Sequence, residues 1–210
     1  MPFSPLKALG RLHGTTVHKR RVRVIADHVA ALMPKGLRVL DVGSGDGRIA
    51  ALLMEKRPDL RIEGVDVLVR EGTAIPTKEF DGQTLPHGDD EFDAVMMIDV
   101  LHHAVDPAAL MAEAARVAGS CVMIKDHHRT GFAAETTLRF MDWVGNRAHG
   151  VALPYNYLSP PEWSEMFERL GLVVDETRTR LSLYSLPATW FFDRSLHFVA
   201  RIVRSEESHA

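Results

Sequence analysis

Short apolar runs alternate with longer segments of mixed polarity along most of the chain. Each run is bounded by glycine, aspartate or proline, which is a pattern typical of buried strands. The clearest runs lie at residues 38–42, 61–66, 94–98 and 121–124, and two further strand candidates lie at 172–177 and 197–203.

The segments between these runs carry signals for helices. Residues 17–33 form one helical stretch, and Asp46 is predicted to cap a helix over 47–58. An aspartate followed by proline predicts a helix over 107–117. A capping box with prolines in its first turn begins another helix at Ser159. Because strands and helices alternate, we expect an α/β fold with a mostly parallel sheet and helices on both faces.

Composition is that of an ordinary globular domain, since 46% of the 210 residues are hydrophobic and 25% are charged. The formal net charge is −3, so the positive surface of a nucleic-acid binder is missing and we expect no nucleic-acid partner. No apolar run approaches the ~20 residues that cross a bilayer, and the N-terminus lacks the apolar core of a secretory signal. We therefore expect no membrane insertion and a cytoplasmic location.

The strongest local motif is a strand that runs into a glycine-rich turn, VLDVGSGDG at 39–47, ahead of a predicted helix. Glycines at alternate positions allow a sharp turn and a close approach of backbone to a ligand. Asp66 follows at the end of the next strand, where a carboxylate can accept hydrogen bonds from ribose hydroxyls. A dinucleotide fingerprint would require a small residue where Arg48 stands. The motif predicts a nucleoside ligand, either an adenosyl compound or a dinucleotide.

From residue 22 to residue 124, the motifs and their order resemble those of the class I S-adenosylmethionine-dependent methyltransferases, in the small-molecule group that includes the quinone-biosynthesis type. The resemblance implies S-adenosylmethionine as cofactor and a single-domain Rossmann-like sandwich with a lid between the fifth and sixth strands. It rests on DVGSGDG (41–47), GVD (64–66), DGQTLP (81–86), EFDAV (91–95) and DVLHH (99–103).

The resemblance also implies which residues hold the cofactor. Asp41 and the glycines after it hold the methionine portion. Asp66 binds the ribose, Val67 lies against the adenine, and Asp81 contacts the adenine amino group. Asp66 as a strand-end cap and Asp81 as a turn former are the alternatives. The full predicted set is Asp41, Gly43, Ser44, Gly45, Asp66, Val67, Asp81, Gly82 and Ile98.

Histidines follow two of the predicted strands, at the edge where the ligand is expected. Methyl transfer is an in-line displacement that depends mainly on alignment, and a neutral histidine can remove a proton from the acceptor. His102 and His103 stand in one loop, and His127 and His128 in the other. We expect His102 and His127 to act as proton acceptors, oriented by an aspartate. Asp126 and Asp99 are the candidates for that orienting role.

The chain has no spaced metal-ligand pattern such as H-E-x-x-H, and adjacent histidines rarely aim at one ion, so we expect no metal site. The single cysteine, Cys121, lies in an apolar run and is expected in the core.

Aromatic residues are frequent in the segment between the apolar runs at 121–124 and 172–177. By the resemblance this stretch forms a lid over the methyl acceptor, with Trp143, Tyr155 and Tyr157 lining an apolar or aromatic pocket. The alternative is that these rings only pack the lid on the sheet. The acceptor is expected to be a small molecule, and its identity and the oligomeric state are left open.

We thus predict one methyltransferase domain over residues 1–204, with an N-terminal helical segment at 1–34, a lid at 127–165 and a polar tail at 205–210. Two other functions compete with this interpretation. A nicotinamide-dependent oxidoreductase would share the glycine turn, and a non-catalytic methyltransferase-like module would share the cofactor site and activate a partner. An RNA methyltransferase is disfavoured by the acidic balance.

Overall fold

Alternate residues of the strands point to opposite faces of one sheet in the computed structural model, and this two-residue period divides the hydrophobic core. In the strand Phe92–Ile98, Val95 and Met97 belong to one buried cluster, whereas Ala94 and Met96 belong to the other. Helices cover both faces, so both sets of side chains are buried and the strand reads as a continuous apolar run. The structure describes residues 5–146, 154–186, 188–193 and 195–205.

The sheet has seven strands in the order β3-β2-β1-β4-β5-β7-β6. Neighbouring strands are parallel except for β7, which is antiparallel to both β5 and β6. The strands are β1 (Arg38–Val42), β2 (Arg61–Asp66), β3 (Thr77–Glu79), β4 (Phe92–Ile98), β5 (Ala118–His127), β6 (Leu172–Arg178) and β7 (His197–Arg204).

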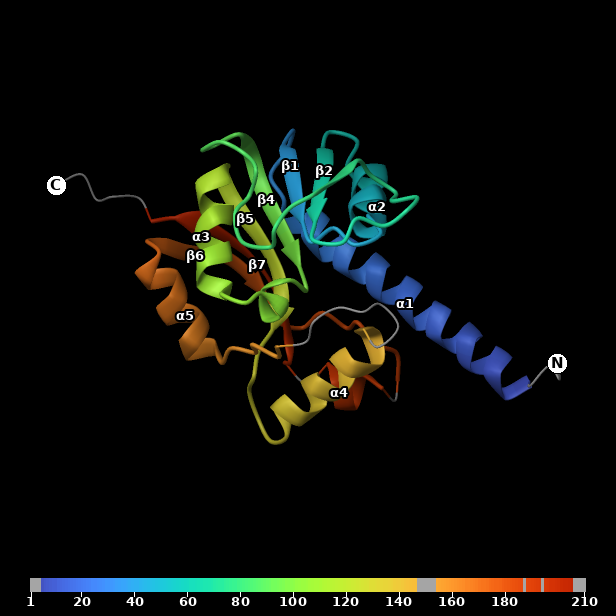
Figure 1. Ribbon diagram of the computed structural model, residues 1–210. Helices are drawn as coiled ribbons and strands as arrows, with labels where there is room; N and C mark the ends of the chain where they lie inside the picture. The colour runs from blue at the N-terminus through green and yellow to red at the C-terminus, as the bar shows by residue number, and fades with distance from the viewer. Residues whose placement is uncertain (1–4, 147–153, 187, 194, 206–210) are drawn as a thin grey trace.

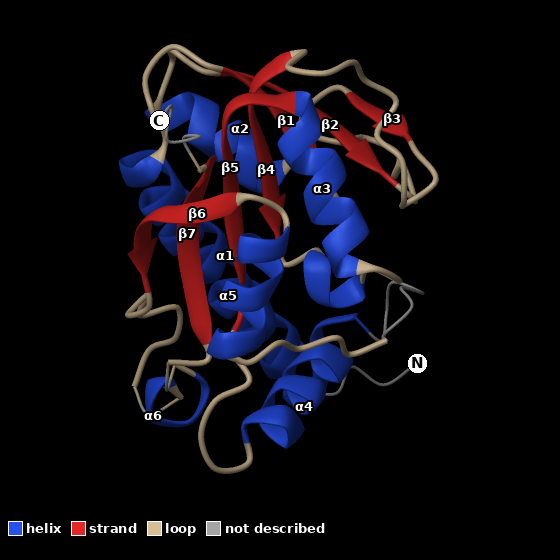
Figure 2. Cartoon of the chain, turned by 90° about the vertical axis from the view of Figure 1, so that its left-hand side faces the viewer, coloured by secondary structure: helices blue, strands red, loops and turns tan. Residues whose placement is uncertain are grey.

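Helices pack on both faces, as Figures 1 and 2 show, which confirms the predicted α/β architecture. Helices α1 and α2 contribute to one buried cluster, and α3 and α5 contribute to the other. Helix α4 lies beyond the ends of the central parallel strands rather than on a face of the sheet (Figure 1). The helices are α1 (Pro5–Leu32), α2 (Arg48–Lys56), the 3₁₀ helix η1 (Leu101–His103), α3 (Pro107–Val117), α4 (Ala134–Asn146), α5 (Pro160–Arg169) and α6 (Thr189–Phe192).

Local start signals were correct for two helices and wrong for a third. The Asp106 side chain accepts hydrogen bonds from the N–H groups of Ala108 and Ala109, and the capping box at Ser159 is formed with Glu162. Helix α2 instead begins after Gly47, which adopts a left-handed conformation at the N-cap with no side-chain cap. Its predicted cap, Asp46, lies one residue too early because the glycine turn extends through residue 47.

The predicted lid contains a helix and is packed by its own small core. Ala134 and Leu138 of α4 form a third buried cluster with Tyr157 and Leu196, separate from the two faces of the sheet. Residues 147–153 of the predicted lid and 206–210 of the predicted tail lie outside the described residues. Among the described residues, no helix is both long and apolar enough to span a bilayer.

Candidate active site

The glycine turn after β1 is held against two neighbouring strand ends. Gly43 and Ser44 donate their N–H groups to the Val65 carbonyl at 2.8 and 3.2 Å, which ties the turn to β2. Gly43 has a φ of +69°, and a Cβ there would lie 2.6 Å from Cγ2 of Val100, just beyond β4. Position 43 therefore requires glycine for both its backbone conformation and its packing.

Asp66 lies at the mouth of this turn. One of its carboxylate oxygens accepts the N–H of Gly45 at 2.7 Å, and the other accepts the N–H of Leu68 at 2.9 Å. The carboxylate does cap the strand end, and each oxygen keeps a lone pair for a further donor such as a ribose hydroxyl. Beside it, a Cβ built on Gly45 would meet no atom within 4 Å, so the backbone of the turn is open to a ligand.

The loop after β3 approaches the end of β2 from the other side. A Cβ built on Gly82 would lie 3.0 Å from Cγ1 of Val67, whose side chain is 56% exposed. Asp81 accepts the N–H groups of Gln83 and Thr84 through one oxygen, at 2.8 and 2.7 Å. Asp81 therefore forms a turn, and the turn places Gly82 against Val67.

Asp41 is the buried acid beneath the turn, with only 3% of its surface exposed. Burial raises the pKa of Asp41 to about 8, and the negative charge of Asp66 adds to the shift. A carboxyl group in this environment is stabilised in its ionised form by a neighbouring cation. Ile98 ends β4 close by and packs against the core cluster under α1 and α2. A cation bound beside Asp41 is thus compatible with the charge of the predicted residues.

The three predicted catalytic residues form one buried group. Asp126 accepts hydrogen bonds from Nδ1 of His102 at 2.7 Å and Nδ1 of His127 at 3.2 Å through the same oxygen. Its second oxygen accepts the N–H of Leu101 at 3.1 Å. Burial alone would raise the pKa of Asp126, but the charge of His102 and the hydrogen bonds from both histidines hold it well below its usual range. Asp126 is therefore an ionised carboxylate that positions two imidazole rings.

The two histidines have opposite electrostatic surroundings. Burial works to lower the pKa of His102, but the carboxylates of Asp126 and Asp142 outweigh it and raise that pKa to about 10. Burial and the charge of Lys125 hold the pKa of His127 well below its usual value. Of the two, His127 is the neutral imidazole at physiological pH.

A second network next to this group joins Asp99, the other candidate for the orienting role, to Lys125 and Arg21, which the sequence did not single out. Lys125 is fully buried and donates a hydrogen bond to Asp99, whose other oxygen accepts from Arg21 of α1 at 2.5 Å. Burial works against ionisation of Asp99, but both cations together hold its pKa well below the usual range. The pairing had a signal in the sequence, because Asp99 and Lys125 stand at the ends of apolar runs on what became adjacent parallel strands.

The predicted lid aromatics occupy different positions. Tyr157 is buried in the histidine group, with its ring centroid 5.4 Å from that of His102 and its hydroxyl donating to Asp142 at 2.7 Å. Tyr155 is partly buried, and Trp143 on α4 is 49% exposed. His128 stacks on Phe198 at 4.2 Å between ring centroids and does not share the Asp126 hydrogen bonds.

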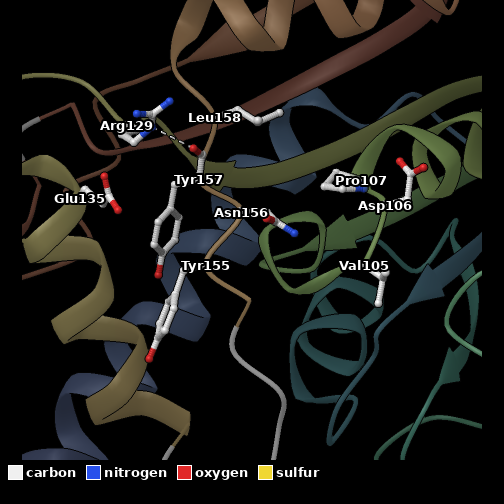
Figure 3. Close-up of a pocket in the computed structure, with 9 residues that line it drawn as sticks. All are labelled: Val105, Asp106, Pro107, Arg129, Glu135, Tyr155, Asn156, Tyr157 and Leu158. Carbon is white, nitrogen blue, oxygen red and sulfur yellow. Dashed lines mark hydrogen bonds between the residues drawn. The ribbon is translucent and has the colours of Figure 1, made fainter.

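An open pocket of about 570 Å³ lies beside the lid segment. Figure 3 shows both tyrosines among its lining residues, with the Arg129 side chain hydrogen-bonded to the Tyr157 carbonyl and Asn156 turned toward the η1 side. Asn156 donates its amide to the Ala104 carbonyl at 2.8 Å, which fixes the segment over η1. The pocket wall is therefore anchored to the same turn that carries His102.

The α/β fold places the predicted cofactor residues at the carboxyl ends of its parallel strands, the edge where open α/β sheets bind ligands. A family profile described as a methyltransferase domain matches residues 17–177. The chain belongs to this family and is an S-adenosylmethionine-dependent methyltransferase.

Solved structures with low sequence identity share the fold. A chain from the complex of the Haloferax volcanii Trm112 methyltransferase activator with a methyltransferase is 19% identical, with a TM-score of 0.67 and coverage of 98% of this chain and 99% of that one. An S-adenosylmethionine-dependent methyltransferase from Thermotoga maritima is 17% identical, with a TM-score of 0.63 over 95% and 96% of the two chains. Magnesium protoporphyrin IX methyltransferase from Synechocystis, solved with S-adenosylhomocysteine, is 17% identical, with a TM-score of 0.54 over 98% and 90%.

Proposed function

We propose that this enzyme methylates a small molecule with an apolar or aromatic body, at an oxygen, nitrogen or carbon nucleophile, by in-line displacement. The proposal rests chiefly on one observation, which is that buried His102, Asp126, His127 and Tyr157 form a hydrogen-bonding and ring-packed group beside the glycine turn. The two parts are joined by the contact of Gly43 with Val100, the residue before η1. An acceptor seated on this group would lie close to the cofactor site.

The residues at the glycine turn and the neighbouring strand ends are proposed to bind the parts of the cofactor that the sequence predicts. Asp41 and the turn residues Gly43, Ser44 and Gly45 hold the cationic methionine portion, with Ile98 beneath it. Asp66 binds the ribose, while Val67, Asp81 and Gly82 border the adenine. When bound, S-adenosylmethionine supplies an electrophilic methyl group on a sulfonium, so the protein need only align the acceptor and manage its proton.

His127 is the residue we assign as proton acceptor. Donation of its Nδ1–H to Asp126 leaves Nε2 as the unprotonated nitrogen of the ring. Its backbone carbonyl accepts the indole N–H of Trp163 at 3.0 Å, which fixes the residue from the opposite side. His102 donates Nδ1–H to the same aspartate, so Asp126 positions both rings.

The acceptor pocket is proposed to lie under the lid. Tyr157 and Tyr155 offer aromatic walls with hydroxyl groups, and Trp143 offers a partly exposed ring on α4. Such surfaces suit a flat or apolar acceptor with few polar groups. The proposal leaves the identity of the acceptor to experiment.

The direct test is acceptor-dependent release of S-adenosylhomocysteine from a metabolite collection incubated with purified protein. For the acceptor found, we expect His127→Asn to lower kcat at least ~100-fold with cofactor affinity unchanged, because general-base contributions are of about that size. His128→Asn is the matched control and is expected to stay within about twofold. Full activity of His127→Asn across a pH series would contradict the assigned role. Product release that requires a protein acceptor would contradict the small-molecule proposal.

A further inference from the structure

Two imidazole nitrogens and one carboxylate oxygen lie close together on the lid side of His102. Nε2 of His102 and Nε2 of His103 lie 3.5 and 3.8 Å from the same Asp142 oxygen. The two rings are adjacent in η1, with centroids 4.0 Å apart and planes tilted by 46°. The sequence led us to expect that adjacent histidines would not aim at one ion, but the tight 3₁₀ turn and the lid helix α4 bring both rings to one carboxylate.

The distances distinguish this cluster from the hydrogen-bonded group on the other side of His102. Contacts to Asp126 are 2.7 and 3.2 Å, which are hydrogen-bond lengths. The contacts to Asp142 are longer than good hydrogen bonds, and Nε2 of His102 is buried without a hydrogen-bond partner among the described residues. Two ligands on one tetrahedral ion with bonds of about 2.0–2.2 Å lie about 3.3 Å apart, so small shifts would close this cluster around an ion.

The groups behind these ligands have the roles expected around a metal ion. His102 uses Nδ1 for Asp126, which leaves Nε2 for an ion and gives the carboxylate–histidine arrangement common at metal sites. Tyr157 donates its hydroxyl to the other oxygen of Asp142 at 2.7 Å, which fixes that carboxylate. Metal binding displaces the proton that His102 carries on Nε2 in the metal-free protein, and the carboxylates of Asp126 and Asp142 then balance the 2+ charge of the ion.

We propose that His102, His103 and Asp142 bind a divalent transition-metal ion of the zinc class. Two imidazoles and one carboxylate suit Zn²⁺, Co²⁺ or Fe²⁺ better than Mg²⁺ or Ca²⁺, which prefer all-oxygen ligands. Three protein ligands leave a coordination position for water or for an oxygen or nitrogen atom of a ligand. The side chains of His103 and Asp142 are 17% and 10% exposed, so the site has a route to solvent. Metal binding itself does not depend on the acceptor proposed above.

The test is a Co²⁺ titration of untagged, chelator-treated full-length protein without cofactor, followed by visible absorption and by calorimetry. We expect one Co²⁺ per chain with the absorption bands of a low-coordinate site, displaced by Zn²⁺. Asp142→Asn should weaken binding more than ~100-fold, and Tyr157→Phe by about 10- to 100-fold, since loss of a residue behind the ligands has that effect. Glu135→Gln, which changes an exposed carboxylate on the same helix, is the control and should bind as the wild type does.

The absence of Co²⁺ uptake by folded wild-type protein would overturn the metal site. Equal affinities for Asp142→Asn and Glu135→Gln would overturn it as well. Binding of S-adenosylhomocysteine and circular dichroism establish that each variant is folded, and His103→Gln replaces Asp142→Asn if the latter fails this check. Because the readout requires no turnover, a negative result leaves the methyl-transfer proposal standing, and the reverse also holds.

Discussion

Burial and cofactor binding favour opposite protonation states of the Asp41 carboxyl. Its raised pKa of about 8 means that the carboxyl is largely neutral below that pH in the ligand-free protein, whereas a bound cation favours the ionised form. Binding of a sulfonium nucleoside should therefore release a proton below pH 8. We therefore expect Asp41 to lower the stability of the ligand-free protein near neutral pH and to strengthen the binding of a cationic cofactor.

The affinity for S-adenosylmethionine should accordingly rise between pH 6 and pH 8, by at most about tenfold per unit, and then level off. Calorimetry in buffers of different ionisation enthalpy measures the released proton directly. The variant Asp41→Asn should bind more weakly and lose most of this pH dependence. A wild-type profile as flat as that of the variant would contradict the assignment.

The raised pKa of Asp41 also makes the free energy of unfolding depend on pH. The folded protein holds a proton on Asp41 up to about pH 8, whereas the unfolded chain loses it near pH 4, so this group makes the free energy of unfolding fall as pH rises through that window. In ligand-free protein, the stability of Asp41→Asn relative to the wild type should increase from pH 5 to pH 8. Urea unfolding at the two pH values measures this difference.

At the scale of single residues, the sequence predicted the acids that end or follow strands better than the acids on helices. Asp41, Asp66 and Asp126 stand next to apolar runs, so the sheet places them at one edge. Asp142 could not be predicted, because nothing in an amphipathic helix indicates which of its polar side chains will turn toward a strand end. Lys125 was missed because a lysine beside an apolar run reads as the end of the strand, whereas β5 continues through it.

The ion pair of Arg21 with Asp99 ties helix α1 to the carboxyl end of β4. Arg21 reaches Asp99, which sits in a left-handed backbone conformation with a φ of +58° just after β4. Removal of the arginine takes away one of the two cations that hold Asp99, and Lys125 remains. The helix thus contributes to the charge balance beneath the histidine group as well as to the core.

We expect Arg21→Met to lower the free energy of unfolding by about 1–3 kcal/mol, which is discounted from the cost at a fully buried pair because the arginine side chain is 31% exposed. Arg23→Met, at an exposed position on the same helix, should change it by no more than about 0.5 kcal/mol. Urea unfolding of both variants provides the measurement. Equal changes in the free energy of unfolding for the two variants would show that the Arg21–Asp99 ion pair does not stabilise the protein.

The sequence predicted the strands that form apolar runs and the helices that begin with a capping residue or proline. It missed the elements that carry neither signal. The runs at 38–42 and 61–66 match β1 and β2 residue for residue. Strand β3 is the three-residue segment Thr-Lys-Glu at the sheet edge, where solvent exposure leaves no apolar signal. Helix α4 was predicted only as part of a lid, because no Ser, Thr, Asp or Asn immediately precedes its first residue to mark where a helix begins.

The whole molecule places the proposed cofactor and acceptor residues along one edge of a sheet. Parallel order brings the ends of β1, β2, β4 and β5 together, and the lid covers the β4 and β5 side of that edge. The sequence predicted a mostly parallel sheet whose strand ends share one edge, but it did not predict the order of the strands. The way the lid closes on the histidines depends on packing between segments far apart in the chain, which local patterns do not encode.

The central claim is that the cofactor binds where the glycine turn meets Asp66. Calorimetric titration with S-adenosylmethionine tests it most directly, with Asp66→Asn as the variant and Glu55→Gln, an exposed position on α2, as the control. We predict one site per chain in the wild type and the control, and affinity weakened about 10- to 100-fold in Asp66→Asn through lost charged hydrogen bonds. No uptake by folded wild-type protein, or equal affinity in Asp66→Asn, would contradict the account.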